Sequence, residues 1–298
     1  MKNLIEYMYK ININTIESND NYYIISDDST NYLFKEYVEV KDIMYIYQIS
    51  NLLNQNSRFC FKVMQNVYNT FISDIDGVRY YLVDIGKEYR KSVDFLDMIS
   101  FYNTSSNYLT TNIQHFCNWD ILWESKLDYF FLQSKKNDIK KSKLSTLFYF
   151  YVGIAENALL YLKSVKENLL QSKSDKICFN HRRIVDNNSK LNFYNPFNFI
   201  VDFMVRDIAE YLKYQYYNNQ EYEDDLVYFL KTENLTNFSA SLLYARIIYP
   251  SYFFDYYESN DEKTFFNKFY DPNDYIKFIK KTYELISSYV NIIKIDWL

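Results

Sequence analysis

The sequence predicts an α+β protein with a small β-rich lobe followed by a larger helical lobe. Short β-branched and aromatic segments separated by turn residues occupy the first part of the chain, and long stretches of helical periodicity begin near residue 91. Hydrophobic residues make up 48% of the 298 residues and charged residues 24%, as in ordinary globular proteins. The predicted domains are residues 1–86 and residues 87–298.

Two helices and two strand pairs are expected in the small lobe. A polar turn at residues 27–30 separates two β-rich segments, which predicts a hairpin. Gly77 suits the positive φ that a second hairpin turn, at residues 74–77, demands. In chain order, the expected elements are a helix at 3–10, strands at 22–26 and 32–38, a helix at 40–54, and strands at 66–73 and 78–85.

Helical periodicity dominates the rest of the chain, with one interruption at residues 177–203. That interruption contains His181, Pro196 and strand-like runs at 191–193 and 199–203. The expected helices are residues 111–136, 143–170, 206–217, 221–231, 237–248 and 272–292. A β-rich lobe with one internal helix, then a helical lobe with a loop-and-strand insert, is the layout of bilobal protein-kinase-like folds.

The composition is unusual in having 3 Gly and 3 Pro beside 34 Tyr and 24 Phe. One explanation is an AT-rich genome, since Tyr, Asn, Ile and Lys have AT-rich codons. The other is selection for tyrosine chemistry, such as oxidative cross-linking in a protective coat. Under either explanation, three glycines cannot support a catalytic design with several glycine-rich phosphate loops.

Charge, cysteine content and hydropathy exclude several classes of protein. The formal net charge of −5 argues against a general nucleic-acid or anionic-membrane binder. Cys60, Cys117 and Cys178 are far apart, which excludes a zinc ribbon and gives no disulfide framework. No apolar signal core follows Met1, and no apolar stretch approaches the ~20 residues of a membrane span. We therefore expect a cytoplasmic protein that neither inserts into membranes nor binds nucleic acid.

One pair of motifs resembles the catalytic segments of small-molecule kinases. Phosphoryl transfer needs a cation on the nucleotide phosphates, carboxylate or amide ligands for Mg²⁺, and a carboxylate near the acceptor hydroxyl. Aminoglycoside-phosphotransferase-type kinases carry H-G-D-x-x-x-x-N followed by I/V-D-F. Here His181 takes the His position, Asn188 the metal-amide position and Asp202 the metal-carboxylate position. Lys35 matches the strand-three lysine, so Lys35, Asn188 and Asp202 are the candidate ligands of Mg·ATP.

The same motifs depart from those of a working kinase. The loop reads His181, Arg182, Arg183, so that a fixed cation replaces the aspartate that serves as catalytic base. General-base catalysis contributes ~10²–10⁴ in rate, which Arg183 cannot supply. The turn at 27–30 has no glycine, and the helix at 40–54 has no Glu. The candidate partners of Lys35 are therefore Glu39, Asp42 and Gln48.

Several segments together resemble the kinase-like spore-coat proteins of endospore formers, the CotS/YutH-like family. They are residues 151–158 (YVGIAENA), 181–183 (HRR), 195–197 (NPF), 201–202 (VD), 206–213 (RDIAEYLK) and 248–253 (IYPSYF). The resemblance implies an aminoglycoside-phosphotransferase-like fold and a role in the coat of the developing spore. It also implies other coat proteins as partners and recruitment from the cytoplasm to the coat.

Each candidate residue also has a structural interpretation. Gly153, Ala155 and Ala158 are typical of close helix packing. His181 is expected to stabilise its loop by a hydrogen bond rather than act as a base, and Lys35 with Asp202 could be an inherited ion pair across the interlobe cleft.

Asp207, five residues after Asp202, is the last candidate. In kinase-like folds an aspartate at this place accepts hydrogen bonds from catalytic-loop amides. We expect Asp207 to hold the 181–183 loop in this way, the alternative being an ordinary first-turn acid.

Three functions are compatible with the sequence. The favoured one is a pseudokinase with a structural or interaction role in spore-coat assembly. The second is an active ATP-dependent small-molecule phosphotransferase, for which Asp186 is the nearest alternative base. The third is a nucleotide-binding regulator without catalysis. The sequence leaves open the phosphate acceptor, the coat partner and the oligomeric state.

Overall fold

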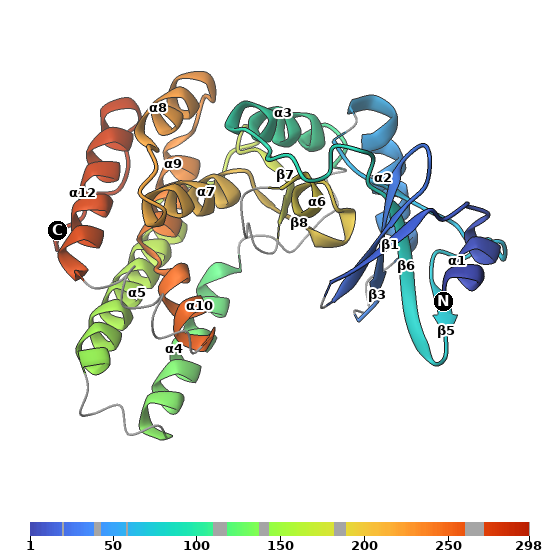
Figure 1. Ribbon diagram of the computed structural model, residues 1–298. Helices are drawn as coiled ribbons and strands as arrows, with labels where there is room; N and C mark the ends of the chain where they lie inside the picture. Colours follow the sequence, from blue (N-terminus) through green and yellow to red (C-terminus); the bar gives the residue numbers. More distant parts are fainter. Residues whose placement is uncertain are drawn as a thin grey trace. The chain divides into compact units, whose positions relative to one another are not determined.

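The computed structural model describes residues 1–19, 21–38, 43–57, 59–109, 118–136, 143–181, 189–259 and 271–297. The chain forms two compact units (Figure 1). The first, called the sheet unit, contains Met1–Tyr108 and His181–Ile200; the second, the helical unit, contains Leu109–Asn180 and Val201–Leu298. The predicted lobe boundary at residue 86 stays a prediction, because a packing unit is a different property from an independently folding domain.

The sheet unit is built on a six-stranded antiparallel sheet of order β1-β2-β3-β6-β4, with β5 paired to β6. The predicted first hairpin is confirmed, and Asp27 rather than a glycine closes its turn by accepting the N–H groups of Ser29 and Thr30, each at 2.7 Å. The strands are β1 (Thr15–Asn19), β2 (Tyr22–Ser26), β3 (Asn31–Glu36), β4 (Lys62–Val63), β5 (Ser73–Ile75) and β6 (Val78–Asp84).

The β5–β6 hairpin confirms one prediction and corrects another. Gly77 does adopt positive φ, at 82°, and together with Asp76 at 54° it forms a two-residue turn. The strand expected at 66–73 was wrong, since only Ser73–Ile75 is extended and paired. Asn66 is the physical reason. Its side-chain oxygen accepts the N–H groups of Tyr68 and Thr70, which folds residues 66–70 into a turn.

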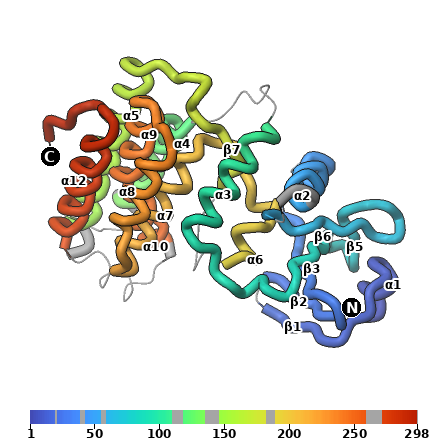
Figure 2. Tube along the Cα trace, turned by 90° about the horizontal axis from the view of Figure 1, so that it is seen from above, coloured from blue at the N-terminus to red at the C-terminus, as the bar shows by residue number. Residues whose placement is uncertain are grey.

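The helices of the sheet unit are α1 (Lys2–Tyr9), α2 (Ile43–Ser57), α3 (Phe95–Ser106) and the short α6 (Lys190–Phe193). The predicted helix at 3–10 is confirmed, α3 was not predicted, and the strand expected at 191–193 was wrong because α6 is helical. The teal α3 and yellow α6 lie side by side in Figure 2, with the rings of Phe101 and Phe193 5.2 Å apart. Packing of Phe193 against α3 therefore outweighs its local strand propensity.

The helical unit is a bundle (Figure 2), and its helix α9 is buried along almost its whole length. Thr236 caps α9 by accepting the N–H of Ser239 at 3.0 Å, and Asp271 caps α12 in the same way. The predicted helix at 111–136 is confirmed from Trp119 onward, while residues 111–117 lie outside the described part; α10 was not predicted. The helices are α4 (Trp119–Lys136), α5 (Lys143–Asn168), α7 (Val205–Tyr217), α8 (Glu223–Thr232), α9 (Asn237–Ile248), α10 (Ser251–Ser259) and α12 (Pro272–Tyr289).

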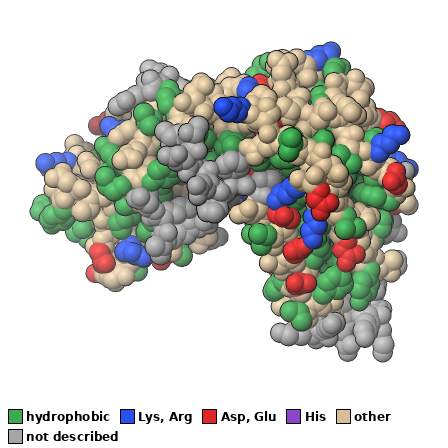
Figure 3. All heavy atoms as spheres, turned by 180° about the vertical axis from the view of Figure 1, so that it is seen from behind, with side chains coloured by type: hydrophobic (Ala, Val, Ile, Leu, Met, Phe, Trp, Pro, Cys, Tyr) green, Lys and Arg blue, Asp and Glu red, His purple; other side chains and the backbone are tan. Residues whose placement is uncertain are grey.

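Two short strands, β7 (Ile177–His181) and β8 (Phe199–Phe203), pair with each other, and a 3₁₀ turn (Pro196–Asn198) precedes β8. The strand predicted at 199–203 is thereby confirmed. No helix in the described ranges has both the length and the apolar character needed to cross a membrane. On the face drawn in Figure 3, acidic and basic side chains are interspersed.

Candidate functional site

Asp202, the candidate metal ligand, lies on β8 with 6% of its surface exposed. Its Oδ2 accepts the indole N–H of Trp119 over 2.8 Å, and its Oδ1 accepts the backbone N–H of Phe203 over 2.8 Å. The Nε of Arg206, one turn into α7, lies 3.6 Å from Oδ2. Both carboxylate oxygens are therefore engaged by groups of the protein itself.

These surroundings do not fit a magnesium ligand. Burial raises the pKa of Asp202, while Arg206 and the Trp119 hydrogen bond act in the opposite direction. Mg²⁺ demands near-octahedral oxygen coordination and keeps several of its waters. A cation at Oδ2 would share that oxygen with the Trp119 N–H and would be repelled by the Arg206 guanidinium. The arrangement neutralises Asp202 with protein groups instead of a metal.

The polar network continues along one face of α7. Arg206, Glu210 and Lys213 follow at helical spacing, and Glu210 Oε1 pairs with Arg246 Nε at 2.6 Å and with Lys213 Nζ at 3.0 Å. The Arg246 guanidinium also lies over the Trp119 ring, 5.1 Å from its centroid. Sequence reasoning missed this network, although alternating charges at helical spacing on a mostly buried helix were a visible signal.

Burial and neighbouring charges shift the pKa values of two residues in this network, Glu210 and Lys213. Burial opposes ionisation of Glu210, but Lys213 and Arg246 outweigh it and lower the pKa of Glu210 to about 2. Burial lowers the pKa of Lys213 to about 8, despite the opposing effect of Glu210. The Lys213 ammonium also donates to Tyr249 O at 3.0 Å and to Ser251 Oγ at 2.6 Å. The network is a satisfied buried ion cluster.

Lys35 projects from β3 in the sheet unit and is partly buried. It stands opposite Tyr81 of β6 and helps line a cavity of about 160 Å³. In that cavity the rings of Tyr81 and Phe197 stack with centroids 3.8 Å apart. Within the described residues Lys35 has no hydrogen-bond or ion-pair partner, and its candidate partners Glu39 and Asp42 lie outside them.

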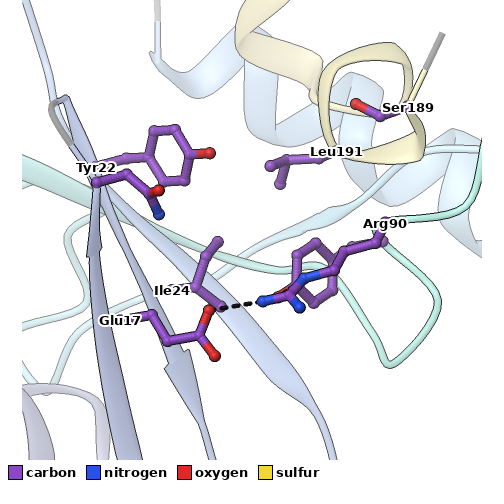
Figure 4. Close-up of a pocket in the computed structure, with 8 residues that line it drawn as sticks. Glu17, Tyr22, Ile24, Arg90, Ser189 and Leu191 are labelled. Carbon is purple, nitrogen blue, oxygen red and sulfur yellow. Dashed lines mark hydrogen bonds and ion pairs between the residues drawn. The ribbon is translucent and has the colours of Figure 1, made fainter. Parts of the chain in front are cut away.

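A larger cavity of about 340 Å³ lies in the same unit (Figure 4). Arg90 Nη2 pairs with Glu17 Oε2 at 2.6 Å, which joins β1 to the segment after β6. Arg90 Nε also donates to the Tyr89 hydroxyl at 2.9 Å. The cavity is lined by Glu17, Asn19, Tyr22, Ile24, Tyr89, Arg90, Ser189 and Leu191.

The unexpected strand β1 changes which turn comes first in the sheet. The sequence placed the first hairpin turn at residues 27–30, but the structure adds β1, so the first hairpin is β1–β2. The two residues between these strands, 20 and 21, are Asp and Asn in the sequence. Neither hairpin connection therefore has the glycine that would favour close backbone approach to phosphate groups.

His181 ends β7 and has 3% of its surface exposed. Its Nε2 lies 2.7 Å from the carbonyl oxygen of Phe193, and its ring packs against Phe101, Phe193 and Phe199. This contact joins the end of β7 to α6, and the predicted stabilisation of the loop stays a prediction. Arg182, Arg183, Asp186 and Asn188 lie outside the described residues.

Asp207 lies in the first turn of α7, with 1% of its surface exposed and its charge acting on Arg206. Its proposed bonds to the amides of the 181–183 loop involve undescribed residues and stay a prediction. Denaturant unfolding of Asp207→Ala tests this prediction, because a loss of unfolding free energy no larger than the ~1 kcal/mol of a helix cap would contradict it.

The facing of Lys35 and Asp202 across a cleft likewise stays a prediction, which chemical cross-linking of Cys variants at the two positions would test.

Comparison with known proteins identifies the fold and the family. The model of the family described as "Spore coat putative kinase YutH" matches residues 2–282. The endospore coat-associated protein YutH of Bacillus subtilis (strain 168) is 24% identical over 168 residues, and this match covers 50% of each chain. The chain thus spans about half the length of the curated relative it matches.

Two solved structures show the same fold. The first is spectinomycin phosphotransferase APH(9)-Ia in complex with ADP and spectinomycin, with a TM-score of 0.61, 13% identity, and coverage of 95% of this chain and 97% of that one. The second is amicoumacin kinase hAmiN in complex with AMP-PNP, Ca²⁺ and Ami, with a TM-score of 0.56, 12% identity, and coverage of 96% and 92%. With its small antiparallel sheet and helical remainder, the chain has a kinase-like α+β fold and belongs to the YutH family of spore coat putative kinases.

Proposed function

We propose that this protein is a spore-coat pseudokinase, whose kinase-like fold serves coat assembly through binding to other coat proteins. Its membership of a spore coat family and its coat-associated relative support the location. Under this proposal the protein is made in the cytoplasm and recruited to the coat. A fluorescent fusion that stays uniformly distributed during sporulation would contradict that location.

The observation that carries the proposal is the environment of Asp202. Its carboxylate is buried, hydrogen-bonded by Trp119 and Phe203, and close to the Arg206 guanidinium. Hydrogen bonds to a charged group contribute about 1.5–3 kcal/mol, and removing one partner of a buried ion pair costs about 3–5 kcal/mol. Magnesium coordination would have to offset these losses, so it is disfavoured at this residue.

The sequence of the catalytic loop points in the same direction. Arg183 stands at the base position, where it cannot accept a proton from an acceptor hydroxyl. Without a base and without a favourable metal carboxylate, both positioning and charge neutralisation in phosphoryl transfer are weakened. The active phosphotransferase alternative would require Asp186 or another carboxylate to replace the base.

Turnover measurements test this proposal. We expect no ADP production above background when the protein is incubated with Mg·ATP and a panel of hydroxyl and amine acceptors. The matched control is Asp202→Asn, which keeps the shape of the side chain and removes its charge. ADP production by the wild type that disappears in Asp202→Asn would overturn the proposal and establish the phosphotransferase.

A second function, metal-independent nucleotide binding, is favoured by the cavity of about 160 Å³ that Lys35 helps to line. A ligand at one hundred times its Kd stabilises the folded state by about 2.7 kcal/mol. Thermal unfolding with ATP and EDTA therefore detects it directly. A rise of the unfolding temperature with ATP that is lost in Lys35→Met would support a nucleotide-regulated coat protein. An unchanged unfolding temperature would exclude nucleotide binding at the concentrations used.

A further inference from the structure

Tyr7 and Tyr68 are the two most exposed tyrosines in the described part of the chain. Their exposed fractions are 62% and 63%, whereas the other exposed tyrosines lie between 41% and 49%. Tyr7 belongs to α1, and Tyr68 lies in the turn between β4 and β5. Both phenol rings are therefore open to an oxidant in solution.

The two tyrosines are also neighbours, although 61 positions separate them in the sequence. The backbone N–H of Val67 donates to the carbonyl oxygen of Met8 over 2.7 Å, which joins the residues adjacent to each phenol. The Tyr7 side chain raises the pKa of Tyr68. The backbone contact between Val67 and Met8 therefore brings together the two segments that carry the phenols.

The backbone on both sides of this pair is fixed. Asn66 Oδ1 accepts the N–H of Tyr68 at 3.0 Å and that of Thr70 at 3.1 Å. On the other side, the Tyr9 hydroxyl bonds Ser73 Oγ at 2.9 Å in a buried contact, which anchors α1 to β5. Two exposed phenols on anchored segments form a preorganised pair.

We propose that Tyr7 and Tyr68 are a site of oxidative modification, where a peroxidase with hydrogen peroxide couples the two phenols into an intramolecular dityrosine. Each phenol loses one electron and one proton to the oxidant, giving two tyrosyl radicals. A carbon–carbon bond then forms between the ring carbons ortho to the hydroxyls, and each ortho hydrogen returns to its oxygen as the ring regains aromaticity. One hydrogen peroxide takes up two electrons and two protons and leaves as two waters, which balances the reaction.

Proximity favours this link over coupling between molecules. Two groups held together on one chain react at an effective concentration of at least ~1 mM, so at ~1 µM protein the internal link is favoured on the order of 10³-fold. The product would tie α1 covalently to the β4–β5 turn. Because the link closes a long loop of the unfolded chain, it should raise the unfolding temperature of the sheet unit.

The test is oxidation of the full-length protein at ~1 µM with a haem peroxidase and limiting hydrogen peroxide, conditions in which coupling within one chain is favoured. We expect dityrosine fluorescence in the monomer band and a peptide joining Tyr7 to Tyr68 that is lighter by two hydrogens. Tyr7→Phe and Tyr68→Phe should each abolish monomer fluorescence.

The matched control is Tyr228→Phe, which removes an exposed phenol of α8 and should leave the monomer signal unchanged. Phenylalanine at an exposed position keeps the ring, so the variants should fold, as an unchanged circular dichroism spectrum would verify. Monomer fluorescence that survives in Tyr68→Phe, or dityrosine found only in covalent dimers, would overturn the proposal.

Discussion

The indole N–H of Trp119 is hydrogen-bonded to Asp202 Oδ2 at 2.8 Å, a buried contact between residues 83 positions apart. It places a helix of the helical unit on the one carboxylate that the kinase motif assigns to metal binding. With Arg206 3.6 Å from the same oxygen, the carboxylate is part of an internal polar network that also contains Arg246 and Glu210. Asp202 thus connects α4, β8 and α7 within the helical unit.

Trp119→Phe should destabilise the protein more than Trp123→Phe. Both rings lie beneath the Arg246 guanidinium, but among the described contacts only Trp119 donates to a carboxylate. The difference should be about 1.5–3 kcal/mol, the contribution of a hydrogen bond to a charged group. Urea unfolding of the two variants measures it. Equal losses would mean that the indole N–H contributes nothing beyond ring packing.

Glu210 should make the protein sensitive to acid. Its pKa falls from an ordinary 4.5 to about 2, so the folded state keeps the carboxylate charged where the unfolded chain is protonated. Its contribution, about 3 kcal/mol, is present above pH 4.5 and is lost as pH falls towards 2. Glu210→Gln should be less stable at pH 7, because Lys213 and Arg246 lose their partner, and its stability should vary less between pH 4.5 and 2. An unchanged pH slope would contradict the assignment.

Lys213 should make the protein more stable as pH rises through the alkaline range, the same direction of change that Glu210 produces in acid. Its pKa falls from 10.5 to about 8, so between these values the unfolded chain binds a proton that the folded protein does not. Wild-type stability should therefore rise from pH 8 to 10.5 relative to Lys213→Met, by up to about 3 kcal/mol. Taking the difference between the two proteins cancels the tyrosines that both contain. A flat difference across this range would show that Lys213 stays charged.

Gly153→Ala should stabilise the protein. The sequence interpretation was that Gly153 permits close helix packing, but a Cβ added there would meet no atom within 4 Å. Gly153 lies in the middle of α5, where glycine is less favourable than alanine by about 0.5–1 kcal/mol. Thermal unfolding should show a higher midpoint for the variant. Destabilisation would point to a contact with a partner molecule or with the undescribed residues.

Local patterns predicted the elements that are specified locally. The β2–β3 hairpin, α7 and α9 follow from alternation, helical spacing and polar turn residues, and their bounds agree to within a few residues. The strand β1 was not predicted, because the residues of Thr15–Asn19 are mostly exposed and show no hydrophobic alternation. The helix α6 was expected to be a strand, because its conformation depends on contacts with α3 that the local sequence does not show.

The candidate site also contains residues that a local motif predicts and residues that only the fold brings together. Asp202 was found because it belongs to a contiguous motif with fixed spacing. Trp119 and Arg246 come from α4 and α9, far from Asp202 in the sequence, and only the fold brings them to it. Arg206 was within the motif region and could have been found, since it follows Asp202 by one helical turn.

Metal titration in the presence of a non-hydrolysable ATP analogue tests the central claim most directly. Isothermal calorimetry with Mn²⁺, which has the ligand preferences of Mg²⁺ and binds more tightly to oxygen and nitrogen ligands, should give the same titration for wild type and Asp202→Asn. Arg206→Gln removes the competing cation and, if it folds, serves as the variant most able to gain metal affinity at Asp202. If the account is correct, wild type shows no binding that depends on Asp202. Manganese binding to the wild type that disappears in Asp202→Asn would contradict it.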